Sequence, residues 1–269
     1  MFRTYILLFL LLQPSYLFSF GLPDKDGMHI TGADVSKTLD ALAVVGYGQG
    51  SCEGAGDGFI IYGQGITTRE AYIKHCGLYF RSSAEAIAVY SEDPFQVVIT
   101  AESHDYSFLC EIDEDSQAVD CDTFKTPDFK KGRLEEVSGI DFDSRGRMYA
   151  VPDNGQYIFR YPARCAERGE CKRNKEIKLP RYYHQMEDIS IEGCVDNPKD
   201  ECIYIGDVGK GGTNDIIIYN LRTEKFSYKR FQKRKNKDTE AMVVYRDVEA
   251  THIVLIHKDS EGSVEYKKY

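Results

Sequence analysis

The sequence contains no tryptophan, only 8 prolines in 269 residues, and no Asn-X-Ser/Thr acceptor for N-glycosylation. Its 23 glycines, 19 tyrosines and 14 phenylalanines suit a turn-rich β protein. A hydrophobic fraction of 42% and a charged fraction of 29% exclude a disordered or collagen-like chain. The length allows one large domain or two small ones, each with a sizeable core.

Positive charge is in deficit, because 43 acidic residues stand against 34 basic ones and give a net charge of −9. This net negative charge disfavours sequence-independent binding to the phosphate backbone of nucleic acids, so we expect no nucleic-acid partner. Common catalytic motifs are also absent from the sequence: there is no GxSxG elbow, no HExxH and no EF-hand loop. The sequence therefore offers no assembled constellation of nucleophile, base and oxyanion donor.

Only one apolar run is long, and it lies at Tyr5–Leu12 behind Arg3. Residues 1–20 are predicted to be a signal peptide, with Ser19 or Gly21 as the small residue near the cleavage point. The run is too short to cross a bilayer of about 30 Å as a helix. We expect residues 21–269 to form one secreted, extracellular domain with no membrane association after cleavage.

All eight cysteines follow this segment and fall into four pairs of near neighbours. None of the pairs has the CxxC spacing of a zinc or redox site. In an oxidising compartment such spacing indicates local disulfides. The predicted pairs are Cys52–Cys76, Cys110–Cys121, Cys165–Cys171 and Cys194–Cys202.

A repeat of about fifty residues is the strongest internal signal. Four glutamates, separated by 51, 51 and 53 residues, each open a short apolar strand, a polar turn and a second strand: Glu85, Glu136, Glu187 and Glu240. Third strands are predicted at Ser107–Ile112, Tyr157–Tyr161, Ile216–Leu221 and Ser263–Lys267, and fourth strands at Ala118–Phe124, Glu176–Leu179 and Lys225–Phe231.

Four antiparallel strands per period indicate an all-β fold, namely a β-propeller. The alternative is a β-sandwich whose strands are regularly spaced by chance. A weaker copy has Asp40 opening its first strand and Gly58–Gly63 as its second. We therefore expect five blades, or six if the chain is incomplete. Met28–Val35 is placed to complete the last blade by closing the ring.

The repeated carboxylates are predicted to gather at the central channel, since the first strand of each blade lines it. The expected ring near one mouth is Asp40, Glu85, Glu136, Glu187, Asp188 and Glu240. The residues that end the second strands are expected at the opposite mouth: Glu102, Asp153, Asp207 and His257. Such a ring favours Ca²⁺ as a cofactor. Alternatively the glutamates accept N–H bonds from the next blade and lock the ring, or they form a catalytic centre.

A basic run stands out in this acidic chain: Lys229, Arg230, Lys233, Arg234 and Lys235. It falls between the third and fourth of the glutamate-opened repeats. A solvated loop between blades is one interpretation of it. The other is a contact for a sulfated polysaccharide or another acidic matrix polymer.

The motifs Glu136–Gly139 (EVSG), Tyr204–Gly209 (YIGDVG) and Glu240–Met242 (EAM) resemble secreted and bacterial β-propellers of the phytase-like and esterase-like class. This resemblance covers about half of the chain. It implies a propeller fold, with six blades as the family's usual number. A phytase would also present a basic pocket for phosphate, and no Lys/Arg cluster lies at the second-strand ends.

Two classes of function follow from the sequence. The first is a secreted, non-catalytic propeller that binds an extracellular ligand or matrix polymer, with calcium at or near its channel. The second is a cation-dependent extracellular hydrolase that acts on a phosphoester or a sugar acid. An assay against a phosphoester panel, with and without Ca²⁺, separates them.

The cysteine spacing predicts the result of peptide mapping under non-reducing conditions. Each of the four local pairs should be recovered as one linked peptide, because a disulfide forms most readily between cysteines that the same hairpin or loop brings together. A linkage between Cys110 and Cys194 would contradict both the pairing and the blade boundaries.

Overall fold

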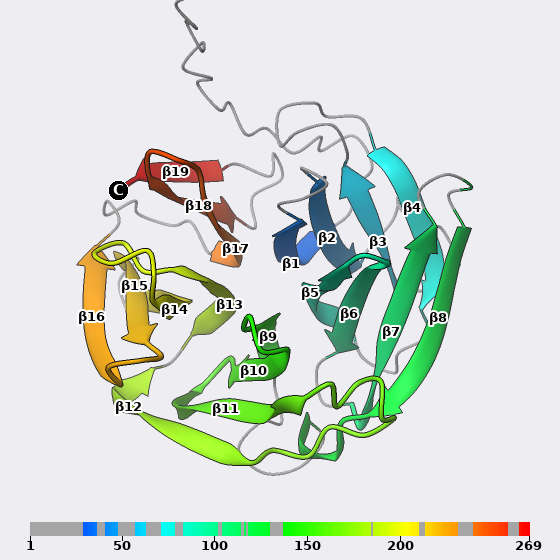
Figure 1. Ribbon diagram of the computed structural model, residues 1–269, viewed down its shortest axis with the longest axis horizontal. Coiled ribbons are helices and arrows are strands. Elements are labelled where there is room, and N and C mark those ends of the chain that lie inside the picture. The colour runs from blue at the N-terminus through cyan, green and yellow to red at the C-terminus, as the bar shows by residue number, and fades with distance from the viewer. Residues whose placement is uncertain are drawn as a thin grey trace, which may run out of the picture.

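The structure is a computed structural model that describes residues 29–36, 41–47, 57–62, 71–78, 83–101, 104–113, 116, 118–129, 137–183, 185–209, 213–230, 239–257 and 264–269. These residues form five antiparallel sheets around a common axis, a five-bladed β-propeller (Figure 1). The predicted fold class is thereby confirmed. Among the described residues, no helix is both long and apolar enough to cross a bilayer.

Each sheet is built from consecutive strands, which run from the axis outward. Blade 1 contains β1 (His29–Ser36), β2 (Ala41–Tyr47), β3 (Asp57–Tyr62) and β4 (Ala71–Leu78). Blade 2 contains β5 (Ala84–Glu92), β6 (Phe95–Ala101), β7 (Tyr106–Asp113) and β8 (Ala118–Lys125). Blade 3, which follows the 3-10 turn η2 (Pro127–Phe129), contains β9 (Val137–Phe142), β10 (Arg147–Pro152), β11 (Gly155–Ala163) and β12 (Lys175–Tyr183).

The last two blades continue the same order. Blade 4 contains β13 (Met186–Gly193), β14 (Glu201–Gly209), β15 (Thr213–Asn220) and β16 (Lys225–Arg230). Blade 5 contains β17 (Thr239–Arg246), β18 (Thr251–His257) and β19 (Val264–Lys268), three strands within the described residues. The predicted third strands of blades 2 to 5 and the predicted fourth strands of blades 2 to 4 overlap the observed strands.

Ring closure differs from the prediction. The segment expected to complete the last blade is β1, and it pairs with β2 as the innermost strand of blade 1. The strand after Asp40 is consequently the second strand of blade 1, not its first, and Asp57–Tyr62 is the third. The ring closes where β1 packs against β17 (Figure 1). Among the described residues, packing of apolar faces rather than a shared strand therefore joins the first blade to the last.

The core consists of five apolar clusters, and each lies between two adjacent blades. Strand β14 shows why. Its Ile203 and Ile205 pack against blade 3, whereas Cys202 and Tyr204 point the opposite way and pack against blade 5. Because side chains alternate across a strand, a sheet sandwiched between two neighbours needs apolar residues on both faces. This explains why strands such as β14 and β18 read as nearly continuous apolar runs.

Three of the predicted disulfides are present: Cys110–Cys121, Cys165–Cys171 and Cys194–Cys202. The first joins directly opposed residues of β7 and β8, and the others close the β11–β12 and β13–β14 connections. The fourth predicted pair lies outside this description, since Cys52 is not among the described residues. Three disulfides indicate an oxidising compartment.

Every innermost strand carries one β-bulge near its start, where one residue has no partner on the second strand. The bulged residues are Thr31, Glu85, Ser138, Glu187 and Glu240. The prediction that Glu136 is equivalent to the other three glutamates is therefore wrong, because Ser138 occupies that position. In blade 1 the equivalent residue is Thr31, not Asp40.

The residue after each bulge is small or acidic: Gly32, Ala86, Gly139, Asp188 or Ala241. A Cβ on Gly139 would lie 2.7 Å from the backbone nitrogen of Ile189 and 2.8 Å from an Asp188 carboxylate oxygen. A Cβ on Gly32 would lie 2.8 Å from the Cα of Ala86. The inner strands of adjacent blades thus approach each other most closely at this level.

Replacing Gly139 by alanine should destabilise the protein by about 1–3 kcal/mol, because backbone atoms of blade 4 would have to move. The matched control is Gly206→Ala in β14, where the nearest atom to a new Cβ is the Met242 sulfur at 3.9 Å. Urea unfolding of both variants checks this expectation. Equal urea midpoints for the two variants would show that the close backbone approach at Gly139 does not exclude a side chain.

Candidate functional site

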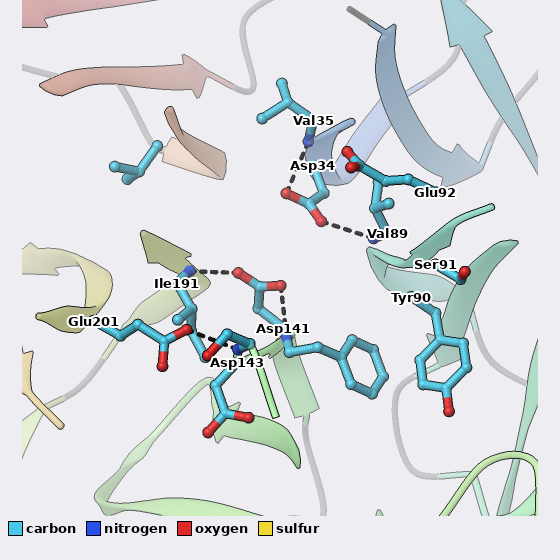
Figure 2. A pocket seen from close by; sticks show the side chains of 13 residues that line it. Asp34, Val35, Val89, Tyr90, Ser91, Glu92, Asp141, Asp143, Ile191 and Glu201 are labelled. Carbon is cyan, nitrogen blue, oxygen red and sulfur yellow. Dashed lines mark hydrogen bonds between the residues drawn. The ribbon is translucent and has the colours of Figure 1, made fainter. Parts of the chain in front are cut away.

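The axis of the propeller is organised by two aspartates that bond to backbone N–H groups of two blades at once. One oxygen of Asp34 accepts the N–H of Val35 at 2.8 Å, and the other accepts that of Val89 in blade 2 at 2.7 Å. Asp141 repeats this arrangement, accepting the N–H groups of Phe142 and of Ile191 in blade 4 (Figure 2). Each aspartate therefore ties its own blade to the next one.

A serine completes this level of the channel. The N–H of Val244 in blade 5 donates to the hydroxyl of Ser190 at 3.3 Å. The five equivalent N–H groups of the innermost strands are thus all satisfied by three side chains. An innermost strand has no further strand to pair with, and an unpaired buried N–H costs about 1–3 kcal/mol.

Asp188 performs the same task one level further along the axis. Its two oxygens accept the N–H of Ile189 at 2.7 Å and the N–H of Met242 at 3.0 Å. The N–H of Ala33 in blade 1 bonds to it as well. Burial raises the pKa of Asp188 well above its usual range, and these three N–H bonds oppose that rise. Asp188 thereby connects blades 4, 5 and 1.

A pocket of about 330 Å³ opens at the end of the channel where the innermost strands finish. We call it the channel-mouth pocket. Five carboxylates line it, and none of its described lining residues is lysine or arginine: the carboxylates belong to Asp34, Glu92, Asp141, Asp143 and Glu201 (Figure 2). It is therefore a strongly acidic cavity on the axis of an acidic protein.

The outer three carboxylates are held in place by neighbours. Glu92 accepts the hydroxyl of Ser36 at 3.0 Å, and Glu201 accepts the N–H of Ser144 at 2.7 Å. Asp143 is paired with Arg147, whose Nε lies 2.6 Å from a carboxylate oxygen. The pocket wall is consequently fixed by bonds from strands and tight turns before any ligand arrives.

Three of the glutamates predicted to form the ring lie at the other end of the channel, where the innermost strands begin. Glu85, Glu187 and Glu240 are half-buried at the bulges, whereas Asp40 and Glu136 fall outside the described residues. The prediction that the second-strand ends lie at the opposite mouth is wrong. In antiparallel pairs the end of the second strand lies beside the start of the first, as Asp207 does opposite Met186 and His257 opposite Thr239.

Within the described part of the chain, no three histidine, cysteine or acidic side chains lie together closely enough to hold an ion. Around the axis, each oxygen of Asp34, Asp141 and Asp188 already accepts a backbone N–H. Of the ring residues, Asp188 is thus placed to act on the backbone.

The predicted polyanion contact is described only at its start. Lys229 lies 5.5 Å from the ring centre of Tyr269, and Arg230 is 3.4 Å from a carboxylate oxygen of Asp215. Lys233, Arg234 and Lys235 lie outside the described residues. The described portion sits on β16, the outermost strand of blade 4, away from the channel-mouth pocket.

Sequence reasoning missed Asp34 and Asp141, although a signal for them exists. They end the tetrapeptides Thr31–Asp34 (TGAD) and Ser138–Asp141 (SGID), which share a hydroxyl, a glycine and an aspartate at matching positions. The hydroxyl of Thr31 donates to the Ala84 carbonyl at 2.6 Å, and that of Ser138 donates to the equivalent carbonyl of Met186. A search for this short pattern would have found the axial residues of blades 1 and 3.

At the other mouth, Asp207 is a buried carboxyl whose pKa is raised toward neutral pH. Its side chain is 3% exposed, and burial raises its pKa to about 6. The guanidinium of Arg181, 3.8 Å away, partly opposes this rise. Because the folded-state pKa is raised, the stabilising effect of the bound proton is complete near pH 4 and is lost as the pH rises through 6.

Asp207→Asn should therefore raise the free energy of unfolding by about 1–3 kcal/mol at pH 8, with the gain vanishing below about pH 4. Urea unfolding across this pH range is the measurement. The exposed Asp196→Asn serves as control and should stay within about 0.5 kcal/mol of the parent. A gain from Asp207→Asn that did not change with pH would refute the assignment.

No protein-family model matches the sequence, and no curated protein sequence matches it either. Among solved structures, the major allergen Mala s 1 of Malassezia sympodialis is similar with a TM-score of 0.51 at 11% identity, covering 90% of this chain and 78% of the allergen. A Lactobacillus plantarum protein is similar with a TM-score of 0.46 at 11% identity, covering 89% of this chain and 70% of that one. The likeness to the allergen supports the β-propeller fold, and the resemblance to the phytase-like class stays a prediction.

Proposed function

We propose that this protein is a secreted, ligand-binding β-propeller that takes a cationic group at its channel-mouth pocket. The observation that carries the proposal is the lining of that pocket, where five carboxylates share one cavity with no lysine or arginine among the described lining residues. Clustered carboxylates repel one another, and a bound cation relieves that repulsion. The volume of about 330 Å³ lies at the small end of the range for ligand pockets.

The scaffold around the pocket supports binding rather than a large conformational change. Asp34 and Asp141 are each fixed by two backbone N–H groups from two blades. The cation would meet side chains that already hold their positions, so little ordering entropy would be lost on binding. Ligand charge, more than ligand shape, would then decide the affinity.

Two kinds of cation fit this chemistry, and both are included in the proposal. Ca²⁺ prefers oxygen ligands and is abundant outside cells. Since no group of three ligands is preformed among the described residues, Ca²⁺ would keep part of its water shell. An organic ammonium group would instead use its N–H donors to bond the carboxylates directly.

The test is isothermal titration of the disulfide-intact protein with CaCl₂ and, separately, with putrescine. The double variant Glu92→Gln/Glu201→Gln keeps hydrogen-bond acceptors for Ser36 and Ser144 but removes two of the five charges. It should weaken binding at least tenfold. For a Ca²⁺ site with Kd of about 10⁻⁴ M, 1 mM Ca²⁺ would stabilise the parent protein by about 1.4 kcal/mol, a shift in Tm of about 3–6 °C.

The matched control is Glu170→Gln/Glu249→Gln, which changes the net charge equally at two surface sites outside the pocket. It should bind like the parent. Equal weakening in the two double variants would show a general charge effect and defeat the proposal. Turnover of a phosphoester in the presence of Ca²⁺ would replace it with the hydrolase alternative.

A further inference from the structure

A second cavity lies beside the channel-mouth pocket, between blades 3 and 4, and we call it the blade 3–4 groove. Its volume is about 520 Å³. Blade 3 contributes the β9–β10 turn and strands β10 to β12, and blade 4 contributes the β13–β14 loop and the β15–β16 turn. Ser144 and Glu201 line both cavities and form the wall between them. The groove is large enough for a small organic molecule, not only for an ion.

The charge of the groove is opposite to that of its neighbour. Three carboxylates line it, from Asp200, Glu201 and Glu224. Six cationic residues also line it: Arg145, Arg147, Arg160, Lys175, Lys199 and Arg222. The groove is therefore basic on a chain whose net charge is −9.

Three of these cations already have carboxylate partners. Arg147 is paired with Asp143. The Lys175 ammonium lies 2.8 Å from Glu224, and the Arg222 guanidinium lies 2.5 Å from Asp200. These pairs are local. Six cations stand against four carboxylates once Asp143 and Glu201 are counted, so the groove keeps an excess of two positive charges, which the other three cations carry.

The remaining three cations are Arg145, Arg160 and Lys199. Within the described part of the chain, none of them lies within 4 Å of a carboxylate, whereas exposed cations elsewhere, such as Arg164 and Lys268, do. Arg145 and Lys199 are exposed on turns at the rim, and Arg160 is half-buried on β11. Arg160 thus lies inside the groove, and Arg145 and Lys199 lie at its rim.

Arg160 is also oriented. Its Nε donates to the side-chain oxygen of Asn174 at 3.1 Å, which leaves the fork of terminal nitrogens for another acceptor. The buried rings of Tyr149 and Tyr219 belong to the groove lining beside it. A guanidinium fixed in this way suits two parallel bonds to a tetrahedral oxyanion.

From this arrangement we propose that the blade 3–4 groove binds a phosphate or sulfate ester, with Arg160 as the anion-binding residue and Arg145 and Lys199 as rim cations. Gathering like charges in one groove is unfavourable unless an anion neutralises them. The acidic channel-mouth pocket next to it repels the same anion and confines it to the groove. This site is separate from the proposed cation site and does not depend on it.

The test is titration of the disulfide-intact chain, at fixed ionic strength, with inorganic phosphate, inorganic sulfate and a sulfated disaccharide. Arg160→Gln should weaken binding at least tenfold, and Lys199→Gln about threefold. Tighter binding of the disaccharide than of either inorganic ion would identify a sulfated saccharide as the ligand class. Tighter binding of phosphate would identify a phosphate ester.

Two controls lose the same kind of charge outside the groove. Arg164→Gln removes an arginine paired with Glu167 on the β11–β12 connection, and Lys229→Gln/Arg230→Gln removes the described part of the basic run. Both should bind like the parent. Equal weakening by Arg160→Gln and Arg164→Gln, or no saturable binding of any of the three probes, would overturn the proposal.

A variant that should bind the anion more tightly complements these tests, because misfolding can weaken binding but does not strengthen it. Glu224 is 63% exposed, and its removal frees Lys175 without opening the core. Glu224→Gln should therefore bind the anion about threefold more tightly than the parent, while Ca²⁺ binding at the channel mouth is unchanged. Unchanged or weaker anion binding by this variant would contradict the groove's assigned charge.

Discussion

The structure depends on how the N–H groups at the axis of the propeller are satisfied. Five innermost strands turn one edge toward the channel, where no further strand can pair with them. Asp34, Asp141 and Ser190 accept the N–H groups of one level, and Asp188 accepts three of the next. Since most of these bonds cross from one blade to another, the same side chains that satisfy the backbone also hold the ring closed.

This constraint shapes both cavities. Carboxylates used as backbone acceptors leave the channel mouth acidic, and the turns that follow β9 and β13 carry Asp143, Ser144 and Glu201 to its rim. The same turns form the wall of the blade 3–4 groove, whose cations lie on the far side. A short stretch of surface thus separates an acidic cavity from a basic one.

The propeller class, the strand order and three of the disulfides could be predicted from the sequence because they are local. A hairpin brings its own residues together, so the period of apolar strands and the spacing of Cys110 and Cys121 carry enough information. The first blade was misplaced by one strand, because its only marker was Asp40, and Asp40 does not open the innermost strand. The second-strand ends lie at the same mouth as the starts of the innermost strands, because neighbouring strands run antiparallel.

The candidate sites depended on the tertiary structure. The sequence by itself determined which residues alternate, where turns fall and which cysteines can meet. Only the closed arrangement of the five blades determined which acidic residues lie at the axis. Asp34 and Val89, for example, are 55 positions apart and come together through blade packing. The bulges also shift the register, and one residue of shift moves a side chain to the other face of its strand. In blade 3 the bulge falls two residues after Glu136, so Ser138 occupies the position that the repeated glutamates had indicated.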